Sequence, residues 1–312
     1  MRGIAALARR PTPAKPGPGP MPEALLRALD VSLGRRVEGL LAGDFPSLDL
    51  GLGAELALVR PYVPGDDVRR IDWNVTARTT VPHVRVDHAE RVLVTWLVLD
   101  ASPSMAFGTA DRRKADVAEG VAVAIGHLAT RRGNRLGVVA FGGSEVRSLP
   151  PRQGRSGLIG LLTALREDPG SRPGAPPPSS ISLAEALTHV ATRARQRALV
   201  VVVSDFRGAR DWRRPLLDVA SRHDVVAVEI RDPREQDLPD VGILWLVDPE
   251  TGRQLRVDTR SRQLRERFAG AAARERAEVA ALLAGVVRRH VVLSTEGEWL
   301  RPLVAALRRR AR

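Results

Sequence analysis

The sequence predicts an α/β protein with a doubly wound, mostly parallel sheet. From residue 92 onward, apolar runs of strand length, such as Ala198–Val203, alternate with segments of helical periodicity. Strands of a parallel sheet are buried on both faces, so they read as unbroken apolar runs. The alternating helices supply the crossovers that parallel strands need and cover both faces of the sheet.

The predicted elements follow in order along the chain. Residues 1–21 are rich in proline and glycine and form a predicted disordered tail, because they cannot bury enough apolar surface to order themselves. A helical pattern opens after Pro22, and residues 22–91 form an N-terminal segment with a strand at Glu55–Tyr62. Residues 92–312 form the main domain. Its strands are predicted at 92–99, 136–141, 198–203, 225–230 and 290–294, and its helices near 112–131, 155–166, 182–197, 213–222, 262–287 and 297–309.

A β-hairpin is predicted just before the helix at 262–287. The run ILWLVDPETGRQLRVD has two strand-like stretches on either side of DPETG, a cluster of turn-forming residues. The proline-rich residues 170–180 form a predicted loop. We therefore expect a Rossmann-like sheet with an N-terminal extension and a C-terminal hairpin insertion.

Composition narrows the class of protein. The chain has 312 residues, 44% of them hydrophobic, which is enough for a sizeable core. It has no cysteine, which excludes disulfides, zinc–thiolate sites and thiol catalysis. No apolar run reaches the roughly 18 residues that a membrane-spanning helix needs, and the apolar patch near the N-terminus is too short for a signal peptide. We expect a cytoplasmic protein.

The net charge of +13 favours acidic partners, but its distribution argues against nucleic acid. Only two of the 49 basic residues are lysines, Lys15 and Lys114, and the arginines are spread along the chain without a long basic block. One tyrosine and five phenylalanines offer few surfaces on which bases could stack. A solvated, arginine-rich surface is the simpler interpretation.

The block RPYVPGDDVRRIDW in the N-terminal segment has a pattern of its own. Pro64-Gly65 predicts a tight turn, followed by a short helical turn that carries Val68, Ile71 and Trp73 inward. The arginines of this region could pair with its aspartates and tie the segment to the sheet, or could bind a partner or an anion. The arginines are Arg60, Arg69, Arg70, Arg78 and Arg85, and the aspartates are Asp66, Asp67, Asp72 and Asp87.

The stretch LVLDASPSM is the strongest candidate for a site. Asp100 ends the first strand of the predicted sheet and is followed by Ser102 and Ser104, while VVVSDF places Asp205 at the end of another strand. Ligands of open parallel sheets bind beyond the carboxyl ends of strands, and these oxygens suit Mg²⁺, Mn²⁺ or Ca²⁺. Alternatively, the same residues cap a helix or satisfy loop amides.

LVLDASPSM, the following KADVAEGVAVAIGHLATRRGNRLGVVAF and VVVSDF together resemble the metal-ion-dependent adhesion site (MIDAS) of von Willebrand factor A domains. The resemblance implies that Ser102 and Ser104 ligate a metal directly and that Asp100 and Asp205 act mainly through water. In that family a third loop supplies a threonine. Here the corresponding stretch is SSISLAEAL, with Ile181 at the threonine position and with Ser180 and Ser182, which could replace it, on either side.

Three separated blocks also resemble the family called domain of unknown function 58 (DUF58), over about residues 22–310. They are RPYVPGDDVRRIDWNVTARTTVPHVRVDHAER, the Asp-x-Ser-x-Ser strand and DPREQDLPDVGILWLVDPETG. Members are bacterial or archaeal and are often encoded beside MoxR-type AAA+ ATPases. Many begin with two membrane helices, and this chain looks like the short, soluble form. The resemblance implies such an ATPase as the partner.

Four functions remain open. The first is an interaction module, an adaptor whose bound Mg²⁺ captures an acidic side chain of a protein partner. The second is a metal-free scaffold, which Ile181 favours. The third is a Mg²⁺-dependent phosphohydrolase, but such enzymes need Asp-x-Asp where this chain has Ser102, the histidines form no catalytic arrangement, and a phosphate-binding GxxxxGK[ST] loop is missing. The fourth is an arginine-rich nucleic-acid binder. We expect no enzymatic activity.

Overall fold

The computed structural model describes residues 14–30, 50–88, 94–129, 134–153, 181–248 and 253–308. It divides the chain into a large unit, formed by Met1–Val37 and Leu93–Arg312, and a small unit, Glu38–Val92. The sequence predicted that the N-terminal segment begins at residue 22, whereas the small unit begins at Glu38. The difference arises because the helix over residues 23–30 belongs to the large unit, where Leu29 is fully buried.

The large unit is built on a six-stranded sheet, which confirms the predicted fold class. The strand order is β10-β7-β6-β3-β4-β5, and every neighbouring pair is parallel except β4 and β5. The strands β3, β6 and β7 form its centre and are buried along almost their whole length. The bounds are β3 Val94–Asp100, β4 Arg135–Phe141, β5 Arg147–Gln153, β6 Ala198–Ser204, β7 Asp224–Arg231 and β10 Arg289–Ser294.

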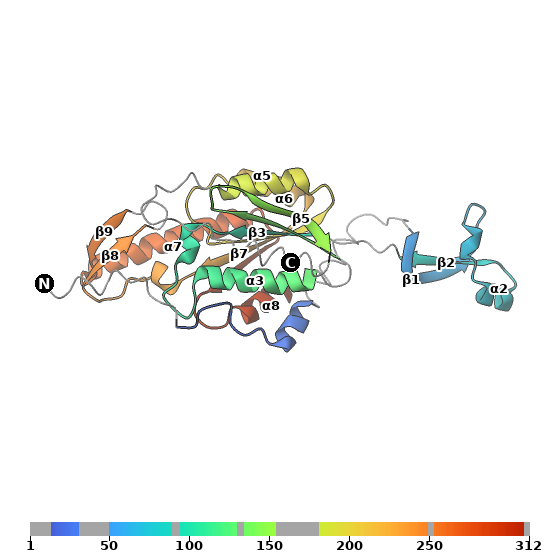
Figure 1. Cartoon of the computed structure of the whole chain (residues 1–312), viewed down its shortest axis with the longest axis horizontal. Coiled ribbons are helices and arrows are strands. Elements are labelled where there is room, and N and C mark those ends of the chain that lie inside the picture. Colours follow the sequence, from blue (N-terminus) through green and yellow to red (C-terminus); the bar gives the residue numbers. More distant parts are fainter. Residues whose placement is uncertain are drawn as a thin grey trace. The chain divides into compact units, whose positions relative to one another are not determined.

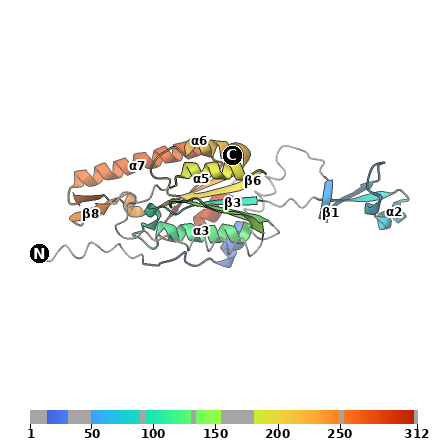
Figure 2. The same ribbon diagram turned by 45° about the horizontal axis from the view of Figure 1, so that its top comes forward.

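Helices cover both faces of this sheet (Figures 1 and 2). Helices α5 (Leu183–Arg193), α6 (Arg213–Arg222) and α7 (Arg262–Ala284) lie on one face, and α3 (Lys114–Ala129) and α8 (Leu300–Arg308) lie on the other. On the first face, Leu187, Leu216 and Leu283 pack in one apolar cluster with side chains of the sheet. The predicted helix at 155–166 and the predicted loop at 170–180 lie outside the described residues. None of the described helices is long and apolar enough to cross a membrane.

Strand β5 was missing from the sequence prediction. Its sequence, RSLPPRQ, contains two prolines, which cannot donate ladder hydrogen bonds. The strand is nevertheless possible because it lies at the edge of the sheet and pairs on one side only, antiparallel to β4. A proline-containing edge strand has no apolar run by which to recognise it.

The predicted hairpin is present as β8 (Ile243–Val247) and β9 (Gln254–Asp258), an antiparallel pair. It lies beside the first turns of α7, at the end of the large unit where α3 also begins (Figures 1 and 2). Alternate residues of β8 are exposed, including Trp245 at 50%. The hairpin is therefore an accessory to the sheet and not part of its core.

The small unit pairs β1 (Leu50–Pro61) with β2 (His83–His88) and adds the 3₁₀ turn η1 (Val68–Arg70) and helix α2 (Trp73–Thr79). Two of the predicted ion pairs are present, Arg60–Asp66 at 2.7 Å and Arg85–Asp72 at 2.9 Å. The inward orientation predicted for Val68 and Trp73 is wrong, because these residues are 60% and 70% exposed. The helical turn ends at Arg70 and Ile71 forms a bridge with Val84, so one helical period does not run through the block.

The described part of the predicted tail contacts the rest of the large unit. The backbone N–H of Lys15 donates to the carbonyl of Asp111 (2.7 Å), and the indole N–H of Trp299 donates to the carbonyl of Pro18 (2.7 Å). Backbone groups of Lys15 and Pro18 thus make hydrogen bonds in this structure. The disorder predicted for residues 1–21 stays a prediction. Composition gives no sign of these contacts, because they use backbone carbonyls and amides, which every sequence has.

Candidate functional site

The candidate site lies where the direction of strand addition reverses in the sheet. From β3 the chain adds β4 and β5 on one side, and then adds β6, β7 and β10 on the other. Strands β3 and β6 pair in parallel, with Leu99 opposite Val203, so their carboxyl ends lie side by side. Ligands of open α/β sheets bind at such switch points. Asp100 and Asp205, close behind these paired residues, therefore reach the same edge of the sheet.

Asp100 anchors a cluster of hydroxyls and carboxylates at this edge. One of its oxygens accepts a hydrogen bond from the backbone N–H of Ser102 (2.9 Å), and the other accepts one from the hydroxyl of Ser204 (2.5 Å). The hydroxyls of Ser102 and Ser104 lie 3.0 Å apart. All of these residues and Asp205 line one cavity of about 800 Å³. The structure thus brings together Asp100, Ser102, Ser104 and Asp205, as the sequence predicted.

The electrostatics of this cavity suit a cation. Burial, and then the negative charge of Asp205, raises the pKa of Asp100 to about 6, although hydrogen bonds from Ser102 and Ser204 oppose the rise. The described lining has six acidic and two basic residues, in a chain with a net charge of +13. A cation among these oxygens would relieve the repulsion between the two carboxylates, and hydroxyl and carboxylate oxygens are hard ligands.

The donor set therefore fits a divalent cation, but only if the serines take part. Among the described residues, no three His, Cys, Asp or Glu side chains gather in a way that could hold a metal ion. The hydroxyls of Ser102 and Ser104 would have to complete the shell that Asp100 and Asp205 begin.

Sequence reasoning missed the ammonium that pairs with Asp205. The ammonium of Lys114, the first residue of α3, donates to Asp205 Oδ2 at 2.6 Å and to Glu235 Oε1 at 2.7 Å, and its side chain is fully buried. Burial alone would lower the pKa of Lys114, but the charges of the two carboxylates outweigh it and raise the pKa. The same ammonium holds the pKa of Asp205 below its usual value against the effect of burial.

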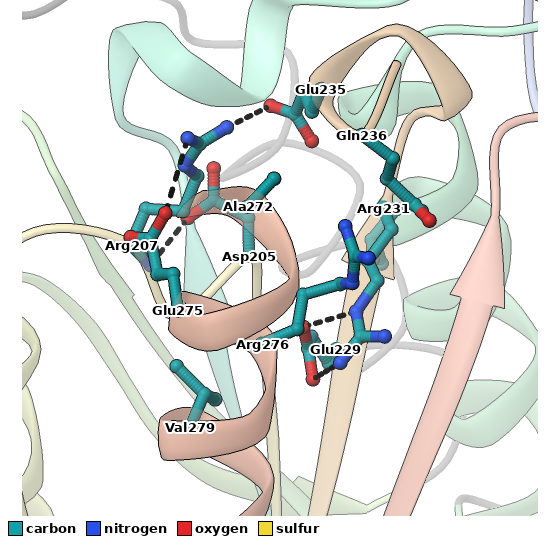
Figure 3. Close-up of a pocket in the computed structure, with 11 residues that line it drawn as sticks. Asp205, Arg207, Glu229, Arg231, Glu235, Gln236, Ala272, Glu275, Arg276 and Val279 are labelled. Carbon is teal, nitrogen blue, oxygen red and sulfur yellow. Dashed lines mark hydrogen bonds and ion pairs between the residues drawn. The ribbon is translucent and has the colours of Figure 1, made fainter. Parts of the chain in front are cut away.

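An ion-pair network extends from Lys114 to α7, and Figure 3 shows the part of it that Arg207, Glu235 and Glu275 form. The guanidinium of Arg207 pairs with Glu235 (3.0 Å) and with Glu275 of α7 (3.5 Å), and Arg210 also reaches Glu275 (3.4 Å). Figure 3 shows Arg207, Glu235 and Glu275 beside a second, small cavity of about 40 Å³, where Glu229 pairs with Arg231. Charged side chains of this network therefore lie beside Asp205.

The loop before α5, which contains Ile181, is hydrogen-bonded to the loop after β4, and that loop in turn lies close to Ser102. The N–H of Gly142 donates to the carbonyl of Ile181 (3.0 Å), and the N–H of Ile181 donates to the carbonyl of Gly143 (2.9 Å). Gly142 has φ +91°, and a Cβ there would lie 2.3 Å from the backbone nitrogen of Ser102. Ile181, at the position where a threonine was expected, lines the cavity and packs against the apolar cluster of the sheet and its helices.

Of the two serines proposed as substitutes for the threonine, the structure describes only Ser182. Ser182 lines the cavity, but its hydroxyl accepts a hydrogen bond from the N–H of Glu185 (3.2 Å) and caps α5. Ser180 lies outside the described residues.

Comparison with known proteins gives matches to a family, to relatives and to solved structures. Residues 58–278 match the family model described as "Protein of unknown function DUF58". An uncharacterized protein of Mycobacterium tuberculosis is 42% identical over 291 residues, which covers 93% of this chain and 90% of that protein. BatB of Bacteroides thetaiotaomicron has a TM-score of 0.42 at 13% identity and covers 69% of this chain and 97% of its own. A von Willebrand factor type A protein of Catenulispora acidiphila has a TM-score of 0.33 at 12% identity and covers 73% and 43%.

Proposed function

The chain belongs to the DUF58 family, and from that premise we propose that its large unit is a protein-interaction module that binds its partner at the hydroxyl–carboxylate cluster. One observation carries the proposal: oxygen-bearing side chains from two adjacent strand ends line a single cavity of about 800 Å³ at the switch point of the sheet. This volume is in the range of ligand sites, roughly 300–1,000 Å³.

Mg²⁺ is the proposed cofactor of this module, with Mn²⁺ and Ca²⁺ as alternatives. The residues that would hold it are Asp100, Ser102, Ser104 and Asp205. When bound, the ion supplies a Lewis-acidic position that an acidic side chain of a partner can complete. The acidic lining of the cavity supports this assignment, since without a cation it would repel a carboxylate.

The proposed partner is an ATPase of the MoxR type, for which this protein would act as an adaptor. The resemblance to the DUF58 family supports this partner, and the net charge of +13 would attract an acidic surface over long range. We place the adaptor in the cytoplasm, where such an ATPase would find it.

A metal-free scaffold is the second candidate, and Lys114 favours it. Because the buried ammonium already lies 2.6 Å from Asp205, part of the carboxylate charge in the cluster is compensated without a metal. In this alternative the cluster serves to hold the loops in place, and partner binding is indifferent to Mg²⁺.

Calorimetric titration of Mg²⁺ into the purified protein separates the two candidates. We expect binding by the wild type, loss of binding in Asp100→Ala and Ser102→Ala, and unchanged binding in Ser221→Ala. Ser221 is a matched control because it is exposed and its hydroxyl bonds only the nearby carbonyl of Asp218 in the described contacts. Wild-type protein that takes up no Mg²⁺ would exclude the metal-dependent module and leave the scaffold.

Partner binding is measured with a purified MoxR-type ATPase on an immobilised sample of this protein. P-loop ATPases themselves need Mg²⁺, so a variant of this chain is a cleaner test than a chelator. An affinity for the ATPase that falls at least tenfold in Asp100→Ala supports the metal-dependent adaptor. Equal affinity of the wild type and Asp100→Ala supports the scaffold. An ATPase that binds neither protein removes the assignment of this partner.

A further inference from the structure

Lys114 lies in a position that leaves its ammonium no freedom. Its side chain is fully buried, its backbone N–H donates to the carbonyl of Phe107 (2.9 Å), and Nζ lies 6.0 Å from the centroid of the Phe107 ring. Both carboxylates that it contacts are also largely buried, with Asp205 4% and Glu235 14% exposed. A buried ammonium is tolerated only when carboxylates compensate it, so Lys114 is a permanent part of the cluster.

Both oxygens of Asp205 accept hydrogen bonds. Its Oδ2 accepts the hydrogen bond from Lys114, and its Oδ1 accepts one from the backbone N–H of Arg207 (3.0 Å). The same carboxylate faces the cavity that Ser102 and Ser104 line. An ion bound among these oxygens would share Asp205 with the ammonium of Lys114, which lies 2.6 Å from Asp205 Oδ2.

We propose that Lys114 sets the affinity of this site for its divalent cation, as an internal charge that weakens metal binding and keeps the empty site folded. The inference rests on the proposed metal site and deepens it, because it assigns the residue that controls loading. Positive charge beside Asp205 lowers the attraction for a second cation, and it also removes the repulsion that would otherwise open the loops when no metal is bound.

Two substitutions of opposite sign test this inference. Lys114→Met removes a positive charge and leaves Asp205 and Glu235 to attract the metal, so we expect Mg²⁺ to bind about tenfold more tightly or better. In the wild type, Glu235 and Asp205 both pair with the Lys114 ammonium. Glu235→Gln removes one of these two negative charges and leaves the ammonium to Asp205 alone, so we expect Mg²⁺ to bind several-fold more weakly. If Lys114 acted only as a structural support, both variants would loosen the site and both would bind Mg²⁺ more weakly.

The measurement is calorimetric titration with Mg²⁺, with the rise in melting temperature caused by Mg²⁺ as a second readout. Lys15→Met is the matched control, because Lys15 is the only other lysine of the chain and its ion pair with Asp111 leaves it 67% exposed. We expect the control to behave as the wild type. In Lys114→Met the Mg²⁺-dependent rise in melting temperature should exceed that of the wild type.

The outcomes separate this inference from the proposed function. Mg²⁺ affinity that rises in Lys114→Met and falls in Glu235→Gln supports the inference. Wild-type binding with unchanged or weaker binding in a folded Lys114→Met overturns the inference and leaves the metal site standing. If Lys114→Met does not fold, Lys114→Gln, which also removes the charge, takes its place, and unchanged or weaker Mg²⁺ binding there overturns the inference. If neither the wild type nor any variant binds Mg²⁺, the metal site itself fails.

Discussion

Asp232 joins three loops at the carboxyl end of the sheet, and replacing it tests whether this junction holds the site in shape. The residue follows β7 and is fully buried. One of its oxygens accepts hydrogen bonds from the hydroxyl of Thr109 (2.5 Å) and the N–H of Arg234 (2.9 Å). The other accepts from the N–H of Thr109 (2.8 Å) and the hydroxyl of Thr295 (2.7 Å). Thr109 follows β3 and Thr295 follows β10, so one carboxylate fixes the loops after three strands.

Asp232→Ala should lower the free energy of unfolding by about 3–5 kcal/mol. Hydrogen bonds to a charged group contribute roughly 1.5–3 kcal/mol each, and donors left buried without an acceptor cost a further 1–3 kcal/mol. The release of a buried charge offsets part of this sum. Asp237→Ala, at an exposed position six residues after β7, should change stability by less than about 0.5 kcal/mol.

The loss should also depend on pH. Burial opposes ionisation of Asp232, but the hydrogen bonds from Thr109, Thr295 and Arg234 outweigh it and lower its pKa from the usual 3.8. A carboxyl group whose pKa is lower in the folded state adds stability above its unfolded pKa, and this stability disappears as the pH falls through the folded pKa. The difference between the wild type and the isosteric Asp232→Asn should therefore be largest near neutral pH and shrink below about pH 4.

Urea denaturation followed by circular dichroism at a series of pH values measures both effects. A loss below 1 kcal/mol in Asp232→Ala at pH 7 would refute the junction. A gap between the wild type and Asp232→Asn that stays constant into acid would refute its electrostatic origin.

Three further predictions concern the candidate site. Gly142→Ala should abolish Mg²⁺ binding in calorimetry and destabilise the protein, since its Cβ would meet the nitrogen of Ser102 at 2.3 Å. The control Gly208→Ala, with φ +88° and open space around it, should lower the free energy of unfolding by only about 1 kcal/mol. Equal losses of stability in the two variants would contradict this prediction. Ile181→Thr should tighten Mg²⁺ binding by adding a hydroxyl to the cavity, and weaker binding in a folded variant would count against it. Asp100→Asn should raise the melting temperature of the metal-free protein, because burial and Asp205 both disfavour the Asp100 charge, and should abolish Mg²⁺ binding; a lower melting temperature would exclude the repulsion.

The parallel strands could be predicted because their burial is written into unbroken apolar runs. β6, for example, is buried at every residue, and its sequence ALVVVVS contains no polar residue before its last position. Strand β5 could not be predicted in this way, since an edge strand with Pro150 and Pro151 is held by backbone pairing on one side. In the small unit, Trp73 was misplaced because the apolar spacing was extended across Ile71 and Asp72, whose extended backbone separates a 3₁₀ turn from a helix.

The oxygen cluster could be predicted because Asp100 and Asp205 each follow a recognisable strand. The partner of Asp205 could not, because a lysine at the start of a helix normally reads as a solvated residue. The one available signal was compositional: Lys114 is one of two lysines in a chain that otherwise uses arginine. An ammonium is a compact charge on a flexible stem, whereas a planar guanidinium needs room for five donors, so a narrow buried position between two carboxylates selects lysine.

The two carboxylates of the cluster are consequently not equivalent. Asp205 is compensated from within the protein by Lys114, and its pKa is lowered, whereas Asp100 is bonded by neutral groups and its pKa is raised to about 6. Without a cation, the unfavourable free energy of the buried negative charge therefore falls mainly on Asp100. A bound cation should accordingly stabilise the ionised form of Asp100 most. Since Ser102 and Ser104 follow Asp100 in the same loop, the first loop is the part of the site that a cation would order, while Asp205 stays fixed by Lys114 whether or not a cation is present.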